Sequence, residues 1–524
     1  MATRYINQMS NTTENNKRIA KNTLLLYIRT LLTMAISLYT SRVILNVLGV
    51  SDYGIYNVVG GVVAMFSVIS GIFSSSISRF ITYELGSKNF ERLQKIFSTS
   101  LNIQLIISAI IILVGEIVGV WFINYKMQIP PERLIAANWV FQCSLLTFVI
   151  NLISIPYNAS IIAHEKMSAF AYISILEVTL KLIIVYLLLL SPFDKLATYA
   201  ILLVTVALIV RETYGIYCKQ HFKECKYQWI YDKKLSKEML SFAGWSFFGN
   251  SAYMFNTQGV NILINLFFGV TFNAARGIAT QVEAAIMQFV NNFTMAINPQ
   301  ITKSYAAGDK EYMFALICRG AKYSYFLLLF FAIPFILEAN TILKLWLKVV
   351  PEYAPIFLRL TMFGSMAMIL GNTMLTAVSA TGNIKYYQIW VTIIGCLVFP
   401  LTWLAYKLGC PVETAYILYM TIYFILVFVR LYFVKKQLQF PVMIFIRQVL
   451  LRVFAVSVFA FAIPTVINYC IPTSIGRLVL TIFCATFVSC FSIFIIGLEA
   501  GERQTILTKV KNIIYKFKPL NKCR

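Results

Sequence analysis

Three arginines lie inside long apolar stretches of the sequence, where a charge is costly in a lipid bilayer. Arg29 lies about seven residues into the first apolar run, and Arg42 and Arg276 lie near the ends of the first and eighth runs. A guanidinium presents N–H donors in a planar fork that suits the oxygens of a phosphate or diphosphate. The three residues are therefore candidates for a cationic, anion-binding cavity. The alternative is that their long side chains reach back to the lipid headgroups.

Small polar residues recur at helical spacing on the first and seventh apolar runs. They are Thr30, Ser37 and Ser41 on the first run and Asn250, Thr257, Asn261 and Asn265 on the seventh. Their hydroxyl and amide groups could line an aqueous cavity and hydrogen-bond a glycan. They could equally join neighbouring helices by hydrogen bonds, as Ser and Asn commonly do in membranes.

Three carboxyl groups in apolar runs have no basic partner at helical spacing. They are Glu116, Glu283 and Glu338. Each could carry a coupling proton, because a buried carboxyl is more easily kept neutral. Each could instead pair with an arginine of another helix. Glu177 and Lys181, one helical turn apart, are predicted to neutralise each other. No nucleophile, nucleotide or metal motif is found, so we expect no catalytic residue, metal or cofactor.

The composition indicates that lipid is the solvent of this chain. Of its 524 residues 59% are hydrophobic and 13% are charged, whereas soluble domains have about 45–50% and about 25%. The net charge of +24 is spread over short clusters between the apolar runs. This is the distribution that the positive-inside rule describes, and it argues against a nucleic-acid partner.

About fourteen runs are long enough to span a bilayer, which takes roughly 20 residues. They lie near 22–48, 56–84, 96–124, 134–161, 168–190, 197–218, 240–268, 272–302, 316–346, 354–380, 386–406, 414–434, 449–471 and 476–498. Most Lys and Arg residues fall on one side of these spans, so both termini are predicted to be cytoplasmic. The predicted fold is an all-α, polytopic membrane protein with short loops.

A weak internal repeat appears when the sequence is shifted by 220 residues. Residues 48–50 then fall on 268–270, and 81–82 fall on 301–302. Six spans separate the copies, which predicts two parallel six-helix repeats related by an axis along the membrane normal. The shift places Asn250 on Thr30, so we expect these two residues at equal depth on opposite sides of a shared cavity.

The repeat gives the expected domain organisation. It comprises a cytoplasmic tail (1–21), a first six-helix half (22–218), a basic linker (219–239), a second six-helix half (240–434), helices 13 and 14 (435–498) and a basic cytoplasmic tail (499–524).

Two stretches carry a resemblance to a known family. Residues 40–61, TSRVILNVLGVSDYGIYNVVGG, are similar to the first loop of bacterial polysaccharide flippases, and residues 298–309, NPQITKSYAAGD, resemble the end of their eighth helix. The family is that of the O-antigen (Wzx-type) flippases, in the superfamily that also holds multidrug exporters and the lipid II flippase.

This resemblance implies alternating access by two halves around a central, often cationic cavity. It also implies that undecaprenyl-pyrophosphate-linked oligosaccharide is carried from the cytoplasmic to the periplasmic leaflet of a bacterial inner membrane, for O-antigen or capsule assembly. The partners so implied are this lipid-linked oligosaccharide, membrane lipids, and a glycan polymerase with other polysaccharide assembly proteins.

Two other functions stay open. A multidrug exporter on the same fold usually has an acidic group in its first or seventh helix, and neither run has one here. A membrane glycan polymerase or ligase usually presents a large periplasmic loop with essential polar residues. The predicted periplasmic loops are short, and His164 and His221 fall on the cytoplasmic side. We therefore expect a transporter and not an enzyme.

Overall fold

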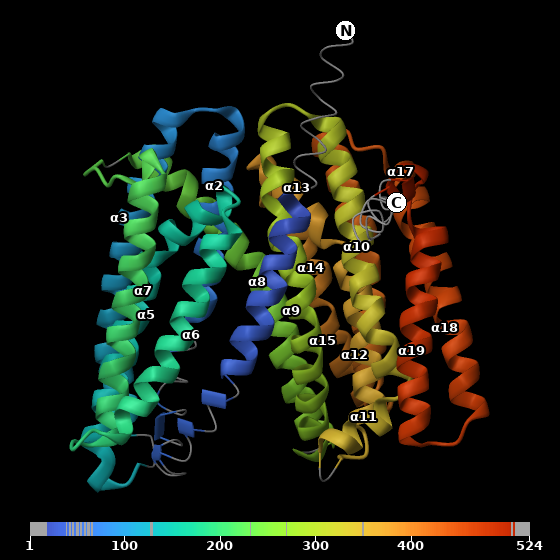
Figure 1. The fold of residues 1–524 in the computed structure, drawn as a ribbon, viewed down its shortest axis with the longest axis horizontal. Coiled ribbons are helices and arrows are strands. Elements are labelled where there is room, and N and C mark those ends of the chain that lie inside the picture. The colour runs from blue at the N-terminus through green and yellow to red at the C-terminus, as the bar shows by residue number, and fades with distance from the viewer. Residues whose placement is uncertain are drawn as a thin grey trace, which may run out of the picture. The chain divides into compact units, whose positions relative to one another are not determined.

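The computed structural model describes residues 18–504, apart from gaps within 38–65 and at 126–128, 231, 269 and 348–349, together with 507–508. Every regular element among these residues is helical (Figure 1). Long apolar runs favour helices in lipid, because a helix satisfies its backbone hydrogen bonds internally. The predicted all-α class is confirmed.

The helices follow one another along the chain with short connections. They are the first helix (Arg18–Ser37), α2 (Ser67–Ser87), α3 (Phe90–Val114), α4 (Val120–Tyr125), α5 (Leu134–Ala163), α6 (Met167–Leu189), α7 (Lys195–His221), α8 (Lys233–Phe268), α9 (Val270–Ala306), α10 (Lys310–Leu337), α11 (Ala339–Trp346), α12 (Ala354–Ile369), α13 (Asn372–Thr381), α14 (Lys385–Cys396), α15 (Val398–Lys407), α16 (Thr414–Leu438), α17 (Val442–Phe445), α18 (Leu451–Cys470) and α19 (Ile475–Ser492).

Eleven helical segments of the described chain are long and apolar enough to cross a membrane. They confirm a polytopic protein. The other three predicted spans, 56–84, 240–268 and 272–302, overlap α2, α8 and α9, which are long but are not among the eleven. The number fourteen therefore stays a prediction.

The chain forms two compact units. Unit 1 comprises residues 1–251, 291–316 and 376–392, and unit 2 comprises 252–290, 317–375 and 393–524. In unit 1, α5 packs against α2 and α7, and α6 packs on α7. In unit 2, α12 packs against α16 and α18 against α19. Unit 1 thus includes two segments of the predicted second half, one of them at the end of α9.

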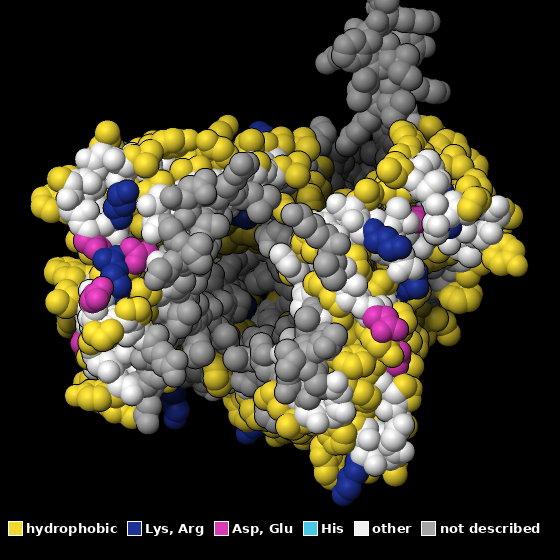
Figure 2. All heavy atoms as spheres, turned by 90° about the horizontal axis from the view of Figure 1, so that it is seen from below, with side chains coloured by type: hydrophobic (Ala, Val, Ile, Leu, Met, Phe, Trp, Pro, Cys, Tyr) yellow, Lys and Arg dark blue, Asp and Glu magenta, His cyan; other side chains and the backbone are white. Residues whose placement is uncertain are grey.

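Large apolar side chains face outward from many helices. Phe459 on α18 and Phe483 and Phe487 on α19 are 57%, 71% and 71% exposed. Figure 2 shows many hydrophobic side chains at the surface of the described helices. A surface of this kind is stable only against lipid or another apolar partner.

Candidate functional site

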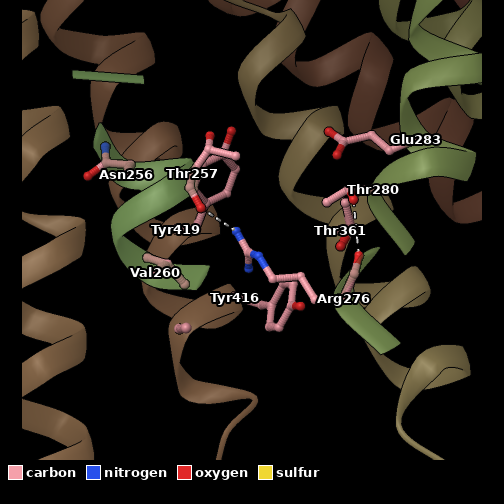
Figure 3. Close-up of a pocket in the computed structure, with 10 residues that line it drawn as sticks. Asn256, Thr257, Val260, Arg276, Thr280, Glu283, Thr361, Tyr416 and Tyr419 are labelled. Atoms are coloured by element: carbon pink, nitrogen blue, oxygen red, sulfur yellow. Dashed lines mark hydrogen bonds between the residues drawn. The ribbon is translucent and has the colours of Figure 1, made fainter. Parts of the chain in front are cut away.

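A small polar cavity lies within unit 2, among four helices. Its polar lining comes mainly from α8 and α9, and α12 and α16 close it (Figure 3). The lining residues are Asn256, Thr257, Val260, Arg276, Thr280, Glu283, Thr361, Ala415, Tyr416 and Tyr419. Its volume is about 50 Å³. A water needs roughly 10–15 Å³ measured in this way, so the cavity has room for a few waters or a small ionic group.

One face of α9 supplies the charged groups of the cavity. Arg276, Thr280 and Glu283 follow one another at spacings of four and three residues, which places them on one side of the helix. The Thr280 hydroxyl donates to the backbone oxygen of Arg276 at 3.1 Å. The spacing therefore aims a cation and a carboxyl into the same cavity, about two turns apart.

The Arg276 guanidinium is held by a backbone group and an aromatic ring. Its Nη2 donates to the backbone oxygen of Thr257 at 3.3 Å, and its Cζ lies 5.4 Å from the ring centroid of Tyr416. In Figure 3 the side chain extends across the cavity toward α8. Among the described residues no carboxylate forms an ion pair with it. The guanidinium thus keeps donors for an anion.

Glu283 lies on the other side of the cavity from the Arg276 guanidinium (Figure 3). Its carboxyl accepts a hydrogen bond from the Ser365 hydroxyl of α12. Glu283 and Arg276 interact electrostatically without touching. A change in the charge of Glu283 therefore changes the potential at the guanidinium.

Two polar atoms of the lining lack a partner in the described structure. Asn256 donates through Nδ2 to the backbone oxygen of Gly395 at 2.6 Å, but its Oδ1 and the Thr361 hydroxyl are buried without a hydrogen bond. A buried polar atom left unsatisfied costs about 1–3 kcal/mol. Water or a bound polar group in the cavity would remove this cost.

Arg29 lies in unit 1, against α6. Its Cζ is 4.8 Å from the ring centroid of Phe170, and the side chain interacts electrostatically with Glu177 and Tyr214. Its Nε is buried without a partner in the described part of the chain. Lys181 Nζ donates to Glu177 at 2.5 Å, which confirms the predicted neutralised pair. Arg29 as a cavity residue stays a prediction.

The predicted polar stripes have varied surroundings. Thr30 is buried and accepts a hydrogen bond from Asn292 of α9 at 2.6 Å, whereas Asn250 is exposed. Ser37 is exposed, and Thr257 and Asn261 are half-buried. The facing arrangement of Thr30 and Asn250 stays a prediction.

Three predicted site residues cannot be placed. Ser41 and Arg42 lie outside the described residues, as does the side chain of Asn265.

The other two carboxyl candidates lie in different environments. Glu116 is exposed and accepts from Gln142 Nε2 at 3.1 Å. The Glu338 side chain is fully buried and accepts from Arg477 Nε and Nη2 at 2.7 and 2.9 Å. Arg477 belongs to α19, so this pair anchors the last two helices to the end of α10. The environment favours a structural role for Glu338.

Sequence reasoning missed most of the neutral lining of the cavity. The missed residues are Asn256, Thr280, Thr361, Tyr416 and Tyr419. Thr280 is the one among them that helical spacing could have revealed, because it lies four residues after Arg276 and three before Glu283, on the same helix face. Asn256 is the neighbour of the predicted Thr257 on α8 but does not follow the spacing of the stripe. Thr361, Tyr416 and Tyr419 come from α12 and α16, and nothing in the sequence reveals which faces of these helices point inward.

Comparisons with known proteins agree with this architecture. The sequence profile of a family described as polysaccharide biosynthesis protein matches residues 19–305. A comparison with curated proteins found no match.

Among solved structures, a mutant form of a MATE protein is similar with a TM-score of 0.68 and 13% identity, over 80% of this chain and 96% of that one. An outward-facing multidrug resistance MATE transporter of the MOP superfamily has a TM-score of 0.65 and 13% identity, over 81% and 96%. A MOP superfamily transporter from Pyrococcus furiosus has a TM-score of 0.61 and 14% identity, over 80% and 96%. At these identities the likeness shows the fold.

The profile covers more than half of the 524 residues. The structural likeness extends over about four fifths of the chain. The chain is thus a multi-pass membrane protein with the fold of the MOP superfamily transporters, and it belongs to the polysaccharide biosynthesis protein family.

Proposed function

We propose that the chain is a flippase for undecaprenyl-pyrophosphate-linked oligosaccharide. It moves this lipid from the cytoplasmic to the periplasmic leaflet of a bacterial inner membrane for O-antigen or capsule assembly. The observation that carries the proposal is Arg276, whose guanidinium lies in a polar cavity with no carboxylate paired to it in the described structure. Membership of a polysaccharide biosynthesis family supports a lipid that carries a glycan as the transported molecule.

The cavity suits the charged part of such a lipid. A diphosphate presents several oxygens, and an arginine can bind two of them through its fork of donors. The unsatisfied Asn256 and Thr361 groups add polar partners nearby. With about 50 Å³ the cavity has no room for an oligosaccharide, so the sugars would occupy wider aqueous space. The polyprenyl chain can remain in lipid against the apolar outer faces.

Glu283 is the carboxyl best placed to couple transport to protons. The Glu283 carboxylate repels a diphosphate and partly cancels the positive potential of Arg276, whereas the protonated, neutral carboxyl does neither. Proton binding at Glu283 would then strengthen anion binding at Arg276, and proton loss would favour release. Glu116, which is exposed, and Glu338, which is ion-paired, have no such relationship with Arg276.

Export of drugs is the second candidate, because the fold is similar to that of a multidrug resistance transporter. Many such drugs are cations, and Arg276 would repel a cation from the cavity. The charge of the cavity therefore favours an anionic cargo.

The test is complementation of a bacterium that lacks its surface-polysaccharide flippase. The wild-type chain should restore surface glycan, and Arg276→Ala should leave lipid-linked oligosaccharide inside the cell. Arg276→Lys should restore part of the display, because it keeps the charge but loses the fork. The same pair of substitutions at Arg29 tests the second predicted cavity cation.

Lys407→Ala is the matched control, because Lys407 is an exposed cation beside Trp403 and outside the cavity. Membrane levels of all variants should be equal. Full glycan display by Arg276→Ala, or drug resistance without glycan display by the wild type, would contradict the proposal.

A further inference from the structure

A second charged cluster lies in unit 1, at the ends of the helices that are predicted to face the cytoplasm. It surrounds Glu165, in the turn between α5 and α6, and its partners come from the first helix and from the end of α9. Glu165 accepts from Lys303 Nζ at 2.5 Å and from Gln300 Nε2 at 2.5 Å. Arg18 Nη2 lies 3.4 Å from the same carboxylate. Three distant parts of the sequence are therefore joined at one side chain.

The Glu165 carboxylate is enclosed, while its cations are not. Its side chain has no exposed surface, whereas those of Lys303 and Arg18 are 22% and 46% exposed. Asn22 of the first helix also donates to the backbone oxygen of Glu165 at 3.2 Å. Asn22 thus fixes the backbone of the turn, while Arg18, Gln300 and Lys303 converge on the carboxylate itself, as donors do around a bound phosphate.

Positive charge is in excess in this cluster. Arg18 and Lys303 each pair with Glu165, and no second carboxylate pairs with either of them in the part of the chain that is described. Two cations therefore share a single negative charge. A dianion at the same place would balance the cluster better than the carboxylate does.

Glu165 adopts a backbone conformation that residues with a Cβ rarely take. Its φ is +59°, in the left-handed region. A glycine would adopt this conformation without strain but would remove the carboxylate. Backbone hydrogen bonds from Glu165 N to Ile162 O and from Lys166 N to Ile161 O, at 2.9 and 3.0 Å, close the end of α5 in this conformation. The turn therefore presents the Glu165 side chain to α9 without depending on the carboxylate for its backbone shape.

The repeat offers a natural comparison. The 220-residue shift places Lys303 on Tyr83 and Gln300 on Phe80. At this equivalent position in the first half, the charged residue at the centre of the contacts is Arg79. Arg79 lies over the rings of Phe80 and Tyr83, at 4.6 and 5.3 Å. Its Nε and Nη2 donate to the backbone oxygens of Ser379 and Ala380, both at 3.0 Å.

These acceptors are main-chain carbonyls in the last turn of α13, and not a side-chain carboxylate. Arg79 thus donates to backbone oxygens, with Glu84 and Glu238 interacting only electrostatically, whereas in the Glu165 cluster the donors bind a carboxylate that a ligand could replace.

We propose that Arg18, Gln300 and Lys303 form a capture site for the diphosphate headgroup of the transported lipid, and that the Glu165 carboxylate occupies this site until the headgroup arrives. The inference rests on the proposed function for the identity of the cargo. The headgroup takes over the three donors because it carries more charge and more acceptor oxygens than one carboxylate. Glu165 is then released, and the α5–α6 turn loses its link to α9.

Binding measurements on the purified full-length protein in nanodiscs test this site. The probes are inorganic pyrophosphate and undecaprenyl pyrophosphate, with a phosphatidylglycerol nanodisc as the control for a general anionic headgroup. Glu165→Gln keeps the shape of the side chain but removes the competing charge. It should raise the affinity for both diphosphates by about tenfold or more, because an internal competitor that fills most sites lowers the apparent affinity by that factor.

Lys303→Gln in the Glu165→Gln background should abolish this gain. Lys310→Gln is the matched control, because Lys310 is an exposed lysine just beyond α9, and it should leave the gain unchanged. Unchanged diphosphate affinity in a folded Glu165→Gln protein would overturn the capture site. So would a gain that survives Lys303→Gln, or one that phosphatidylglycerol reproduces.

This outcome is separable from that of the proposed function. A wild-type chain that restores glycan display, with a Glu165→Gln variant whose affinity is unchanged, contradicts the capture site alone. A wild-type chain that neither restores display nor binds undecaprenyl pyrophosphate contradicts the flippase itself.

Discussion

Thr30 of the first helix accepts a hydrogen bond of 2.6 Å from the Nδ2 of Asn292 on α9, although 262 residues separate the two. Both side chains are buried within unit 1, at 6% and 2% exposure. The contact joins a helix of the predicted first half to one of the predicted second half. It shows that at least one residue of the predicted polar stripe serves helix packing.

Thr30→Val should therefore destabilise the protein. Valine has nearly the shape of threonine but cannot accept a hydrogen bond, so Asn292 would keep a buried, unsatisfied donor at a cost of about 1–3 kcal/mol. The measurement is thermal unfolding in detergent. Thr205→Val is the control, because Thr205 is exposed and its hydroxyl donates to the backbone oxygen of Ile201 in its own helix. Equal melting temperatures for the two variants would contradict the role of the contact.

The ion pair of Arg477 and Glu338 should anchor the last two helices. Arg477→Leu leaves the Glu338 carboxylate buried without its cation, which should cost about 3–5 kcal/mol. Replacing both residues by leucine should recover much of this loss, since neither charge is then left unpaired. Unfolding of the two variants in detergent measures the difference. A double variant less stable than Arg477→Leu would refute this account.

Glu283→Gln tests proton coupling. The amide mimics the protonated carboxyl, so the variant should bind the anionic cargo but lose the dependence of transport on a pH gradient. Rates in vesicles with and without an imposed gradient provide the measurement. Glu116→Gln, in an exposed position outside the cavity, should respond to the gradient like the wild type. A Glu283→Gln variant that still responds fully would show that the coupling group lies elsewhere.

The predicted orientation can be checked with single cysteines in a background whose ten native cysteines are replaced. A cysteine at Lys407 should react with a membrane-impermeant maleimide applied to the periplasmic side. A cysteine at Lys310 should react only after the membrane is permeabilised, because Lys310 belongs to a predicted cytoplasmic cluster. The reverse pattern would invert the topology.

Much of the fold could be predicted from the sequence because lipid imposes simple rules. Hydrophobic length specifies a spanning helix, and this rule located the spans of α5, α6 and α7 to within a few residues. The ranges 240–268 and 272–302 are helical as predicted, in α8 and α9, but their polar residues weaken the hydropathy signal and their crossing of the membrane stays a prediction. Polar residues of α8 and α9 line the cavity, and others on α9 form the hydrogen bonds of unit 1. The helices with the weakest hydropathy are therefore the ones that carry the candidate sites.

The site itself was only partly predictable. Arg276 and Glu283 stood out because a charge in an apolar run is unusual, whereas Tyr416 and Thr361 resemble ordinary membrane residues. Glu165 was overlooked because a carboxylate in a loop is unremarkable in sequence. Its significance comes from Lys303 and Gln300, which lie more than 130 residues away along the chain. Only tertiary structure brings these groups together.

The most direct test of the proposed function is translocation of a labelled lipid in reconstituted vesicles. Undecaprenyl pyrophosphate carrying a short radiolabelled glycan is placed in one leaflet, and a glycan-cleaving enzyme added outside reports its arrival. Wild-type protein should accelerate the transfer over empty vesicles. Arg276→Ala should slow it by about tenfold or more, the effect of losing one charge-assisted hydrogen bond. Transfer no faster than in empty vesicles, with folded wild-type protein present, would contradict the account.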